Sequence, residues 1–194
     1  MKYLKKYSKD FLKAYKNIDL KKIDNIEKIL IEKIKEKKNI FTCGNGGSAS
    51  IANHFLCDFN KGIKISSRKK LLPRVYSLSE NVELITAISN DNDFSDIFEH
   101  QLENLSNKDD ILITFSCSGN SKNILNVLKF AKKKGIFTIN LSGFNSKIKN
   151  KLADINFNIG VKNYGISEDI FQSIMHMISQ SIRRKFSSKT KEII

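Results

Sequence analysis

The sequence predicts an α/β protein, a three-layer αβα sandwich around a five-stranded parallel sheet that is preceded by N-terminal helices. From Asn39 onward, short apolar runs typical of buried strands alternate with amphipathic segments of helical spacing. Two of the strand runs lead into loops rich in glycine and serine, and each loop opens a helix. At 194 residues, 40% of them apolar, the chain is long enough for one domain with a single substantial core.

The first 38 residues are expected to form two helices in front of the sheet. Apolar residues three or four positions apart make two stripes, the first at Leu4, Phe11, Leu12 and Tyr15, and the second at Ile23, Ile26, Leu30 and Ile34. The segment Asn17-Ile18-Asp19 separates the two helices. Helices with apolar faces but no sheet yet to cover are often docked on a partner subunit.

Strands and helices then alternate along the chain. The predicted strands are residues 40–43, 73–78, 111–115, 136–141 and 155–159. The predicted helices are residues 49–59, 82–87 and 96–105, a helix from the loop 116–121 to Lys134, and a closing helix 167–185 with Ser167 as its N-cap. Right-handed crossovers would place helices on both faces of the sheet. The sequence contains no segment typical of a linker, so we expect one domain. It consists of a helical extension (1–38), an αβα core (39–186) and a tail (187–194).

Charge and composition narrow the class of protein. The formal net charge is +14 and the pI is near 9.6, but the lysines are spread over several helices and no aromatic platform accompanies them. We therefore expect a cationic surface that attracts anionic substrates, and no nucleic-acid binding. Cys43, Cys57 and Cys117 lack C-x-x-C or zinc-ribbon spacing and are expected to be reduced thiols. No secretory signal is recognised and no apolar run approaches the roughly 20 residues that span a bilayer, so a cytoplasmic location without membrane contact is expected.

The stronger of the two loops is Ser116-Cys117-Ser118-Gly119-Asn120-Ser121, which follows the third strand. Hydroxyls, backbone N–H groups and the positive end of the following helix would all face one anion. Because the loop lacks the lysine of a P-loop, it favours a single phosphate monoester over a nucleotide triphosphate. The alternative is an ordinary turn with Ser121 as the helix N-cap.

The second loop, Gly44-Asn45-Gly46-Gly47-Ser48, follows the first strand. Its glycines allow positive φ and a close approach of the backbone to a ligand. It does not match G-x-G-x-x-G and no acidic residue follows at the spacing of a dinucleotide fold, so no nucleotide cofactor is expected. In open α/β sheets, loops after neighbouring strands meet at the ligand site, which favours a shared phosphosugar site.

These motifs resemble the SIS sugar-isomerase domain and, more narrowly, the bacterial phosphoheptose (sedoheptulose-7-phosphate) isomerases. The resemblance rests on GNGGS after a strand, SNDNDF at residues 89–94, and S-x-SGNS opening a helix, and it extends from about Asn39 to Arg184. It implies a flavodoxin-like SIS fold. It also implies conversion of a ketose phosphate, most simply sedoheptulose 7-phosphate, to the aldose D-glycero-D-manno-heptose 7-phosphate for heptose-containing cell-surface glycans.

The resemblance also implies which residues bind the substrate. The phosphate would be held by Ser116, Ser118 and Ser121, within the loop that also contains Cys117 and Asn120. The family usually has threonine where this chain has Cys117, which removes one hydroxyl. The sugar would face Asn45, Gly46, Gly47 and Ser48, and its hydroxyls would bind Asn90 and Asp91.

The implied reaction is an aldose–ketose isomerisation through an enediol, in which a base removes a proton beside the carbonyl and an acid or a metal stabilises the oxyanion. The family places histidine and glutamate four residues apart on the helix after GNGGS, where this chain has His54 and Asp58. The spacing puts both on one helical face. Aspartate withdraws the carboxylate by about 1 Å, and a misplacement of that order can cost ~10²-fold in rate.

The closing helix can be aligned with the family's glutamine and histidine, eight residues apart, in two registers. If Gln172 takes the glutamine position, the histidine position falls on Gln180, which cannot transfer a proton. If His176 takes the histidine position, Glu168 replaces the glutamine. We prefer the second register because Asp169 follows Glu168 as an acidic residue follows the family's glutamine.

In the preferred register the resemblance implies a zinc site of His54, Asp58, Glu168 and His176, with Asp58 as base, His176 as acid and Glu168 also near the substrate. It further implies a homotetramer with active sites between subunits. Two alternatives stay open: His176 could be a core or interface histidine without chemistry, and the chain could be a non-catalytic SIS protein. Relatives that lack the catalytic pair serve as tetrameric regulators, including partners of the replication initiator. His100 is expected to be a surface histidine.

Overall fold

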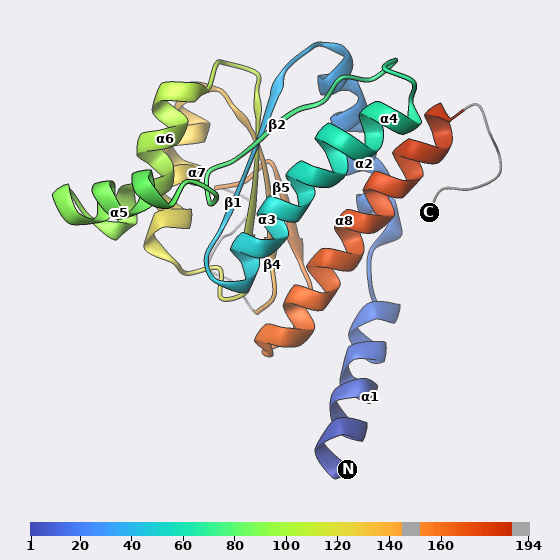
Figure 1. Ribbon diagram of the computed structural model, residues 1–194. Coiled ribbons are helices and arrows are strands. Elements are labelled where there is room, and N and C mark those ends of the chain that lie inside the picture. Colours follow the sequence, from blue (N-terminus) through green and yellow to red (C-terminus); the bar gives the residue numbers. More distant parts are fainter. Residues whose placement is uncertain (145–151, 188–194) are drawn as a thin grey trace.

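The computed structural model describes residues 1–144 and 152–187, and it contains one parallel sheet of five strands (Figure 1). In sheet order the strands are β2 (Arg74–Ser77), β1 (Asn39–Gly44), β3 (Ile111–Ser116), β4 (Phe137–Ser142) and β5 (Ile155–Asn158). In the centre of the sheet, Thr42 pairs with Ser77 on one side and with Ile113 on the other. This is the strand order of flavodoxin-like folds, and the predicted fold class is confirmed.

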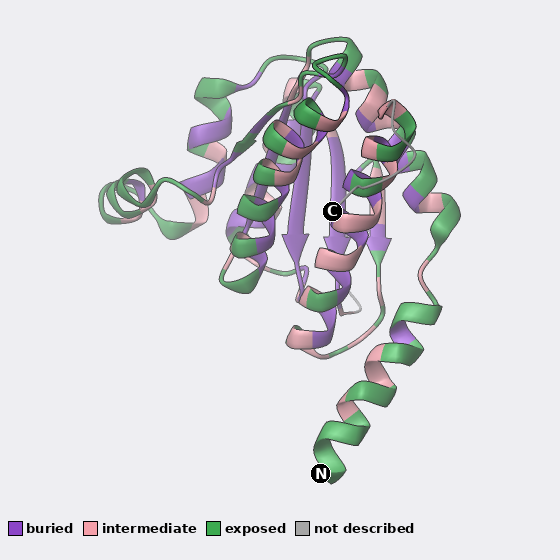
Figure 2. Cartoon of the chain, turned by 45° about the vertical axis from the view of Figure 1, so that its right-hand side comes forward, coloured by how far each residue is buried: buried purple, intermediate pink, exposed green. Residues whose placement is uncertain are grey.

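Helices cover both faces of the sheet, and Figure 2 shows the buried strands between them. One face packs against α2 (Leu20–Lys35), α3 (Gly47–Cys57) and α8 (Tyr164–Phe186), and the other against α5 (Val82–Asp91), α6 (Ile97–Leu105) and α7 (Lys122–Lys134). The short 3-10 turn η2 (Phe94–Asp96) joins α5 to α6 and has no buried residue. Strand residues alternate between two cores: Ile111 and Ile113 join the first, and Leu112 joins the second. Successive side chains of a strand point to opposite faces of the sheet, and parallel sheets are usually covered by helices on both faces.

The two leading helices differ in how far they are buried. In α2, the apolar stripe of Ile23, Ile26, Leu30 and Ile34 is buried as its spacing predicts, and Asp19 caps the helix by accepting a hydrogen bond from Lys22 N. By contrast, α1 (Lys2–Lys16) buries only Ala14 and extends away from the sheet (Figures 1 and 2). Of its predicted stripe, Leu4, Leu12 and Tyr15 are exposed in the single chain, whereas Phe11 packs against the core.

The helix predicted at 49–59 begins at Gly47 and continues past Phe59, through a π-helix, η1 (Asp58–Ile63), into the single turn α4 (Lys64–Ser66). The π-helix allows its residues to make two kinds of contact at once. Phe59 and Ile63 are fully buried in the core, while the Asn60 amide accepts from Val75 N at 3.0 Å and donates to Val75 O at 2.9 Å on the edge strand β2. The wider turn of the π-helix allows both kinds of contact, and the spacing of apolar residues in the sequence did not predict this turn.

The predicted start of the closing helix was wrong. Helix α8 begins at Tyr164, and its N-cap is Asn163, whose side chain accepts a hydrogen bond from Ile166 N at 3.2 Å. Ser167 lies inside the helix, fully buried, and its hydroxyl donates to Asn163 O at 2.7 Å. The Asn163 cap offsets the low helix propensity of Gly165, which had hidden the first turn.

An ion pair between a buried glutamate and a half-exposed lysine joins α2 to the end of α8. The Glu27 side chain is 5% exposed and lies 2.8 Å from Lys185 Nζ, whose side chain is 46% exposed. We expect Lys185→Ala to lower the free energy of unfolding by about 2 kcal/mol, because it leaves a buried carboxylate without its cation. Urea unfolding measures this change. The matched control, Lys28→Ala, breaks the surface pair with Asp24 and should leave the urea midpoint unchanged; equal midpoints for both variants would contradict the prediction.

Candidate functional site

The two Gly/Ser loops lie side by side at the edge of the sheet where the strands end. β1 and β3 are neighbours, and the chain proceeds from β1 to opposite sides of the sheet, to β2 first and then to β3. This is the topological switch point at which open α/β sheets bind ligands. A cavity of about 280 Å³ lies there, lined by Asn45, Gly46, Gly47, Ser48, Phe115, Ser116, Cys117, Ser118, Ser121, Tyr164 and Glu168. Nine of the predicted substrate-binding residues therefore line one cavity.

The loop after β3 has the form of an anion site. Gly119 has φ +62, and the Gly119 N–H donates to the Ser116 hydroxyl at 3.1 Å, which holds the turn. Ser121 occupies the N-cap position of α7, but its side chain makes no cap hydrogen bond. An ordinary capped turn would use that hydroxyl, so its freedom favours a ligand. Asn120, whose N–H donates to the Ser118 hydroxyl, is exposed and is not among the lining residues.

The loop after β1 is tied to the loop after β3 and to α8. The amides of Asn45 and Asn123 donate to each other's oxygens at 3.0 and 2.9 Å, which fixes this loop against the first turn of α7, directly after the loop that follows β3. Gly46 has φ +56. A Cβ at Gly47 would lie 2.3 Å from Glu168 Oε2, so only glycine allows the Glu168 carboxylate to approach this closely. Asn123 was missed in the sequence, although it lies two residues after Ser121.

The cysteine of the loop after β3 is buried. Cys117 Sγ lies 3.8 Å from Ser48 Oγ and 3.8 Å from Glu168 Oε1. Burial raises the pKa of the Cys117 thiol to about 11, so the group is neutral at physiological pH. A neutral thiol adds no negative charge to the loop for which the sequence predicts an anion.

Thiol reactivity tests this description. Cys57 is exposed, whereas Cys43 and Cys117 are buried, and burial also raises the pKa of Cys43. We expect one thiol to react rapidly with Ellman's reagent at pH 7.5 and that phase to vanish in Cys57→Ser. Because the Cys117 pKa is raised, its reaction should speed up as pH rises toward 11. Protein unfolded in guanidinium gives the full thiol content as a control, and three rapid thiols in the folded protein would contradict the prediction.

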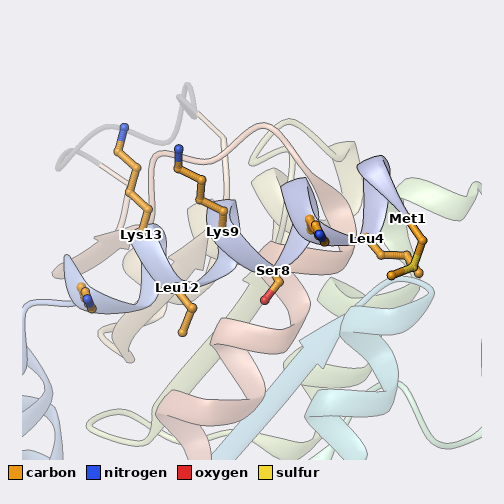
Figure 3. Close-up of a pocket in the computed structure, with 8 residues that line it drawn as sticks. Met1, Leu4, Ser8, Lys9, Leu12 and Lys13 are labelled. Carbon is orange, nitrogen blue, oxygen red and sulfur yellow. The ribbon is translucent and has the colours of Figure 1, made fainter.

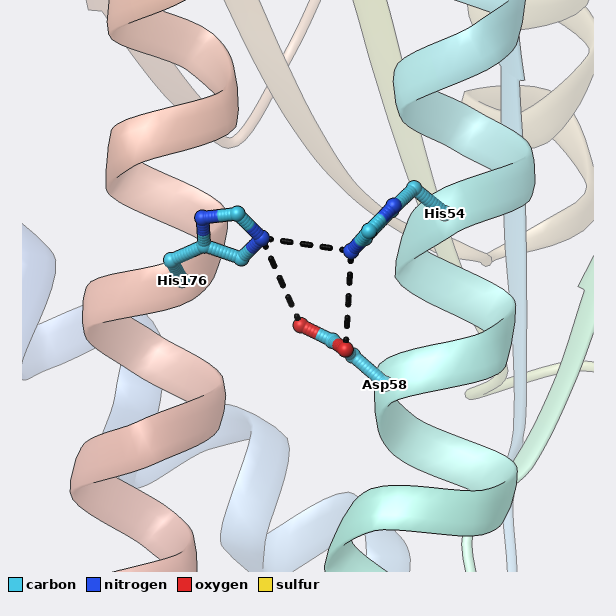
Figure 4. A group of neighbouring side chains, drawn as sticks. All are labelled: His54, Asp58 and His176. Carbon is cyan, nitrogen blue, oxygen red and sulfur yellow. Dashed lines mark hydrogen bonds and ion pairs between the residues drawn. The ribbon is translucent and has the colours of Figure 1, made fainter. Parts of the chain in front are cut away.

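A second polar group comes from α3, the start of η1 and α8. Helices α3 and α8 run side by side on the same face of the sheet (Figure 1). His54, Asp58 and His176 point toward one another (Figure 4). His54 Nε2 lies 3.2 Å from His176 Nε2 and 3.6 Å from Asp58 Oδ1, and His176 Nε2 lies 3.9 Å from Asp58 Oδ2. Three of the four predicted metal-binding residues thus converge within one chain.

The donor atoms fit a zinc ion. Two imidazoles and a carboxylate, with ligand atoms all within 4.8 Å of one another, form the set found in catalytic zinc sites that keep an open position. Ligands at usual zinc distances in tetrahedral geometry lie about 3.3 Å apart, close to the separation of the two histidine nitrogens. On α8, the Gln172 side chain also contacts this group, because its amide nitrogen lies 2.9 Å from His176 Nε2.

Glu168 lies apart from this group. It is eight residues before His176 on α8, lines the cavity between the two Gly/Ser loops, and its Oε1 lies 3.5 Å from Ser48 Oγ. Gln172, between them at i+4 from Glu168, is the side chain that contacts His176 instead. In the sequence, Gln172 is a candidate site residue only in the alternative register. Its four-residue spacing from His176 already indicates that the two side chains are neighbours on the helix.

The remaining predicted residues lie outside the cavity. Asn90 and Asp91 end α5 and are exposed in the single chain, where Asn90 Nδ2 donates to Asp91 Oδ1 at 2.8 Å. His100 is exposed on α6. None of the helices in the described ranges is both long enough and apolar enough to cross a membrane.

Comparison with known proteins gives consistent results. The family described as the SIS domain matches residues 2–143. A phosphoheptose isomerase of Helicobacter pylori is 34% identical over 188 residues, which cover 93% of this chain and 96% of the relative. The structure of a phosphoheptose isomerase from Francisella tularensis is similar with a TM-score of 0.82 at 26% identity, covering 93% and 96% of the two chains. The phosphoheptose isomerase structure from Neisseria gonorrhoeae, at 22% identity, has the same fold with a TM-score of 0.83 over 93% and 97%.

Proposed function

We propose that this chain, which belongs to the SIS-domain family and within it to the phosphoheptose isomerases, interconverts sedoheptulose 7-phosphate and D-glycero-D-manno-heptose 7-phosphate. One observation supports this most directly. The phosphate cavity at the β1–β3 switch point and the group His54, Asp58 and His176 are joined by α8 and by α3 with its continuation η1. A single elongated substrate can therefore reach both.

The separation of the two groups suits a phosphorylated sugar. Glu168 lies at the cavity, and His176 follows eight residues later, which corresponds to about 12 Å of helix. With its phosphate on Ser118 and Ser121, a seven-carbon sugar would direct its far end toward Asp58. Glu168 would then lie beside the middle of the chain, where its carboxylate can accept hydrogen bonds from sugar hydroxyls.

The proposed chemistry takes place at C1 and C2 of the sugar. Asp58 removes a proton from C1 while His176 donates a proton to the C2 oxygen, which gives the enediol. Return of the proton to C2, with loss of the proton on the C1 oxygen, completes the aldose. His54, Asp58 and His176 would alternatively hold a zinc ion, whose Lewis acidity would stabilise the developing negative charge in place of the proton from His176, because a zinc-bound imidazole nitrogen has no proton to donate.

A homotetramer with active sites between subunits is part of the proposal. The exposed side of α1 forms a groove of about 790 Å³, lined by Met1, Leu4, Lys5, Ser8, Lys9, Leu12, Lys13 and Lys16. Figure 3 shows Ser8 and Leu12 on one side of α1, with Lys9 and Lys13 pointing to another. Leu4 and Leu12 are 65% and 52% exposed, and a second copy of the chain would bury them. Sedimentation velocity tests the assembly.

We place this activity in the cytoplasm. A sugar phosphate is charged and does not cross a membrane unaided, so the enzyme that converts it works in the compartment that makes it.

The direct test is to incubate the purified protein with sedoheptulose 7-phosphate, with and without zinc, and to follow formation of the aldose. Product that requires the added enzyme supports the proposal. Binding of the phosphosugar without any product under either condition would favour the non-catalytic SIS role instead.

A further inference from the structure

The Asp58 carboxylate has a partner besides the two histidines. Ser179 Oγ donates to Asp58 Oδ2 at 3.0 Å across the contact between η1 and α8. The Ser179 side chain is 1% exposed, whereas that of Asp58 is 23% exposed and reaches solvent. A buried hydroxyl therefore holds one oxygen of a carboxylate whose other oxygen, Oδ1, faces His54 at 3.6 Å.

The Ser179 hydroxyl has two acceptors to choose between. Its one proton can go to Asp58 Oδ2 or to its own helix, to His176 O at 3.3 Å. A hydrogen bond to a charged oxygen is shorter and about twice as strong as one to a neutral carbonyl, so the proton goes to Asp58. In the part of the chain that the structure describes, Ser179 is the hydroxyl bound to this carboxylate, and the histidines are its other polar neighbours.

We propose that Ser179 is a positioning residue that fixes the Asp58 carboxylate for catalysis; this inference rests on the proposed isomerase function. Aspartate is one methylene shorter than the glutamate of the family, so its carboxylate has less reach. Without an anchor, rotation about the Cβ–Cγ bond would turn either oxygen into solvent. The bond from Ser179 keeps Oδ2 on the α8 side and leaves Oδ1 directed into the site.

The kinetic test is Ser179→Ala, which removes only the hydroxyl and favours the helix. We expect kcat for sedoheptulose 7-phosphate to fall at least ~10-fold, because a misplaced base slows proton transfer. KM should stay within about twofold, because the phosphate loop is unchanged. The matched control is Ser173→Ala on the same helix, where the hydroxyl donates to Asp169 O at 2.9 Å and does not touch the site; it should keep wild-type kcat.

A readout without turnover separates this inference from the proposed function. In protein labelled with ¹³Cγ-aspartate, the Asp58 signal is assigned by its loss in Asp58→Asn, and Ser179→Ala should shift it while Ser173→Ala does not. An unmoved Asp58 signal, or an active wild type whose kcat survives Ser179→Ala, overturns the positioning role. If Ser179→Ala shifts the Asp58 signal but the wild-type protein makes no aldose, the contact between Ser179 and Asp58 stands and the isomerase function is rejected instead.

Discussion

The His176→Ala variant is expected to convert sedoheptulose 7-phosphate with a kcat lowered by about 10³-fold, since general acid–base groups contribute 10²–10⁴-fold. The change removes the proposed acid and one of the three side chains whose ligand atoms lie within 4.8 Å of one another. Zinc content after dialysis, measured by elemental analysis, should fall with it. KM should change little, because the phosphate cavity lies two helical turns away on α8.

The control for this loss is His100→Ala, which removes an exposed histidine on α6, outside the site. It should keep wild-type kcat and zinc content. Wild-type values for His176→Ala on both counts would show that His176 is a structural or interface residue, and the non-catalytic role would then become the better account of the chain.

The fold could be predicted from the sequence because its main elements depend on local patterns. The buried strands are short apolar runs, and the glycines and serines after Cys43 and Phe115 mark where those strands end. Since all five strands are parallel, both loops had to lie at the same edge of the sheet. The cavity between them followed from that geometry.

The details that the sequence did not reveal depend on packing between distant segments. The π-helix at Asp58 exists because Asn60 binds the backbone of β2 while Phe59 fills the core. The contact of Ser179 with Asp58 joins residues far apart in the chain, and no spacing rule predicts it. The contact of Gln172 with His176 was partly predictable: the sequence shows that the two residues lie four positions apart on the helix, but it does not show how the Gln172 side chain is oriented.

The structure also divides the four residues that the resemblance had placed in one zinc site. His54, Asp58 and His176 form one group, and Glu168 lies with the phosphate loop. The binding end and the reacting end of the proposed site can therefore be altered separately. Variants of the histidines should act on kcat, and variants of the serine loop should act on KM.

The double variant Ser118→Ala and Ser121→Ala tests the binding end. Both side chains line the cavity, and Ser121 makes no cap hydrogen bond that its loss would break. Each hydroxyl that donates to a charged phosphate oxygen contributes about 1.5–3 kcal/mol, so removing two should raise KM for sedoheptulose 7-phosphate at least ~100-fold. With the reacting end unchanged, kcat should stay within a few-fold.

Substrate comparison makes this prediction specific for phosphate. The wild type should strongly prefer sedoheptulose 7-phosphate over sedoheptulose, and the double variant should lose most of that preference, because only the phosphate contacts are removed. Ser173→Ala, whose hydroxyl donates to Asp169 O on α8 away from the cavity, is the matched control and should keep the full preference. If the double variant also kept it, the phosphate would bind elsewhere; the helix N-terminus of α7 and its serine loop would then be a structural turn despite the free Ser121 hydroxyl.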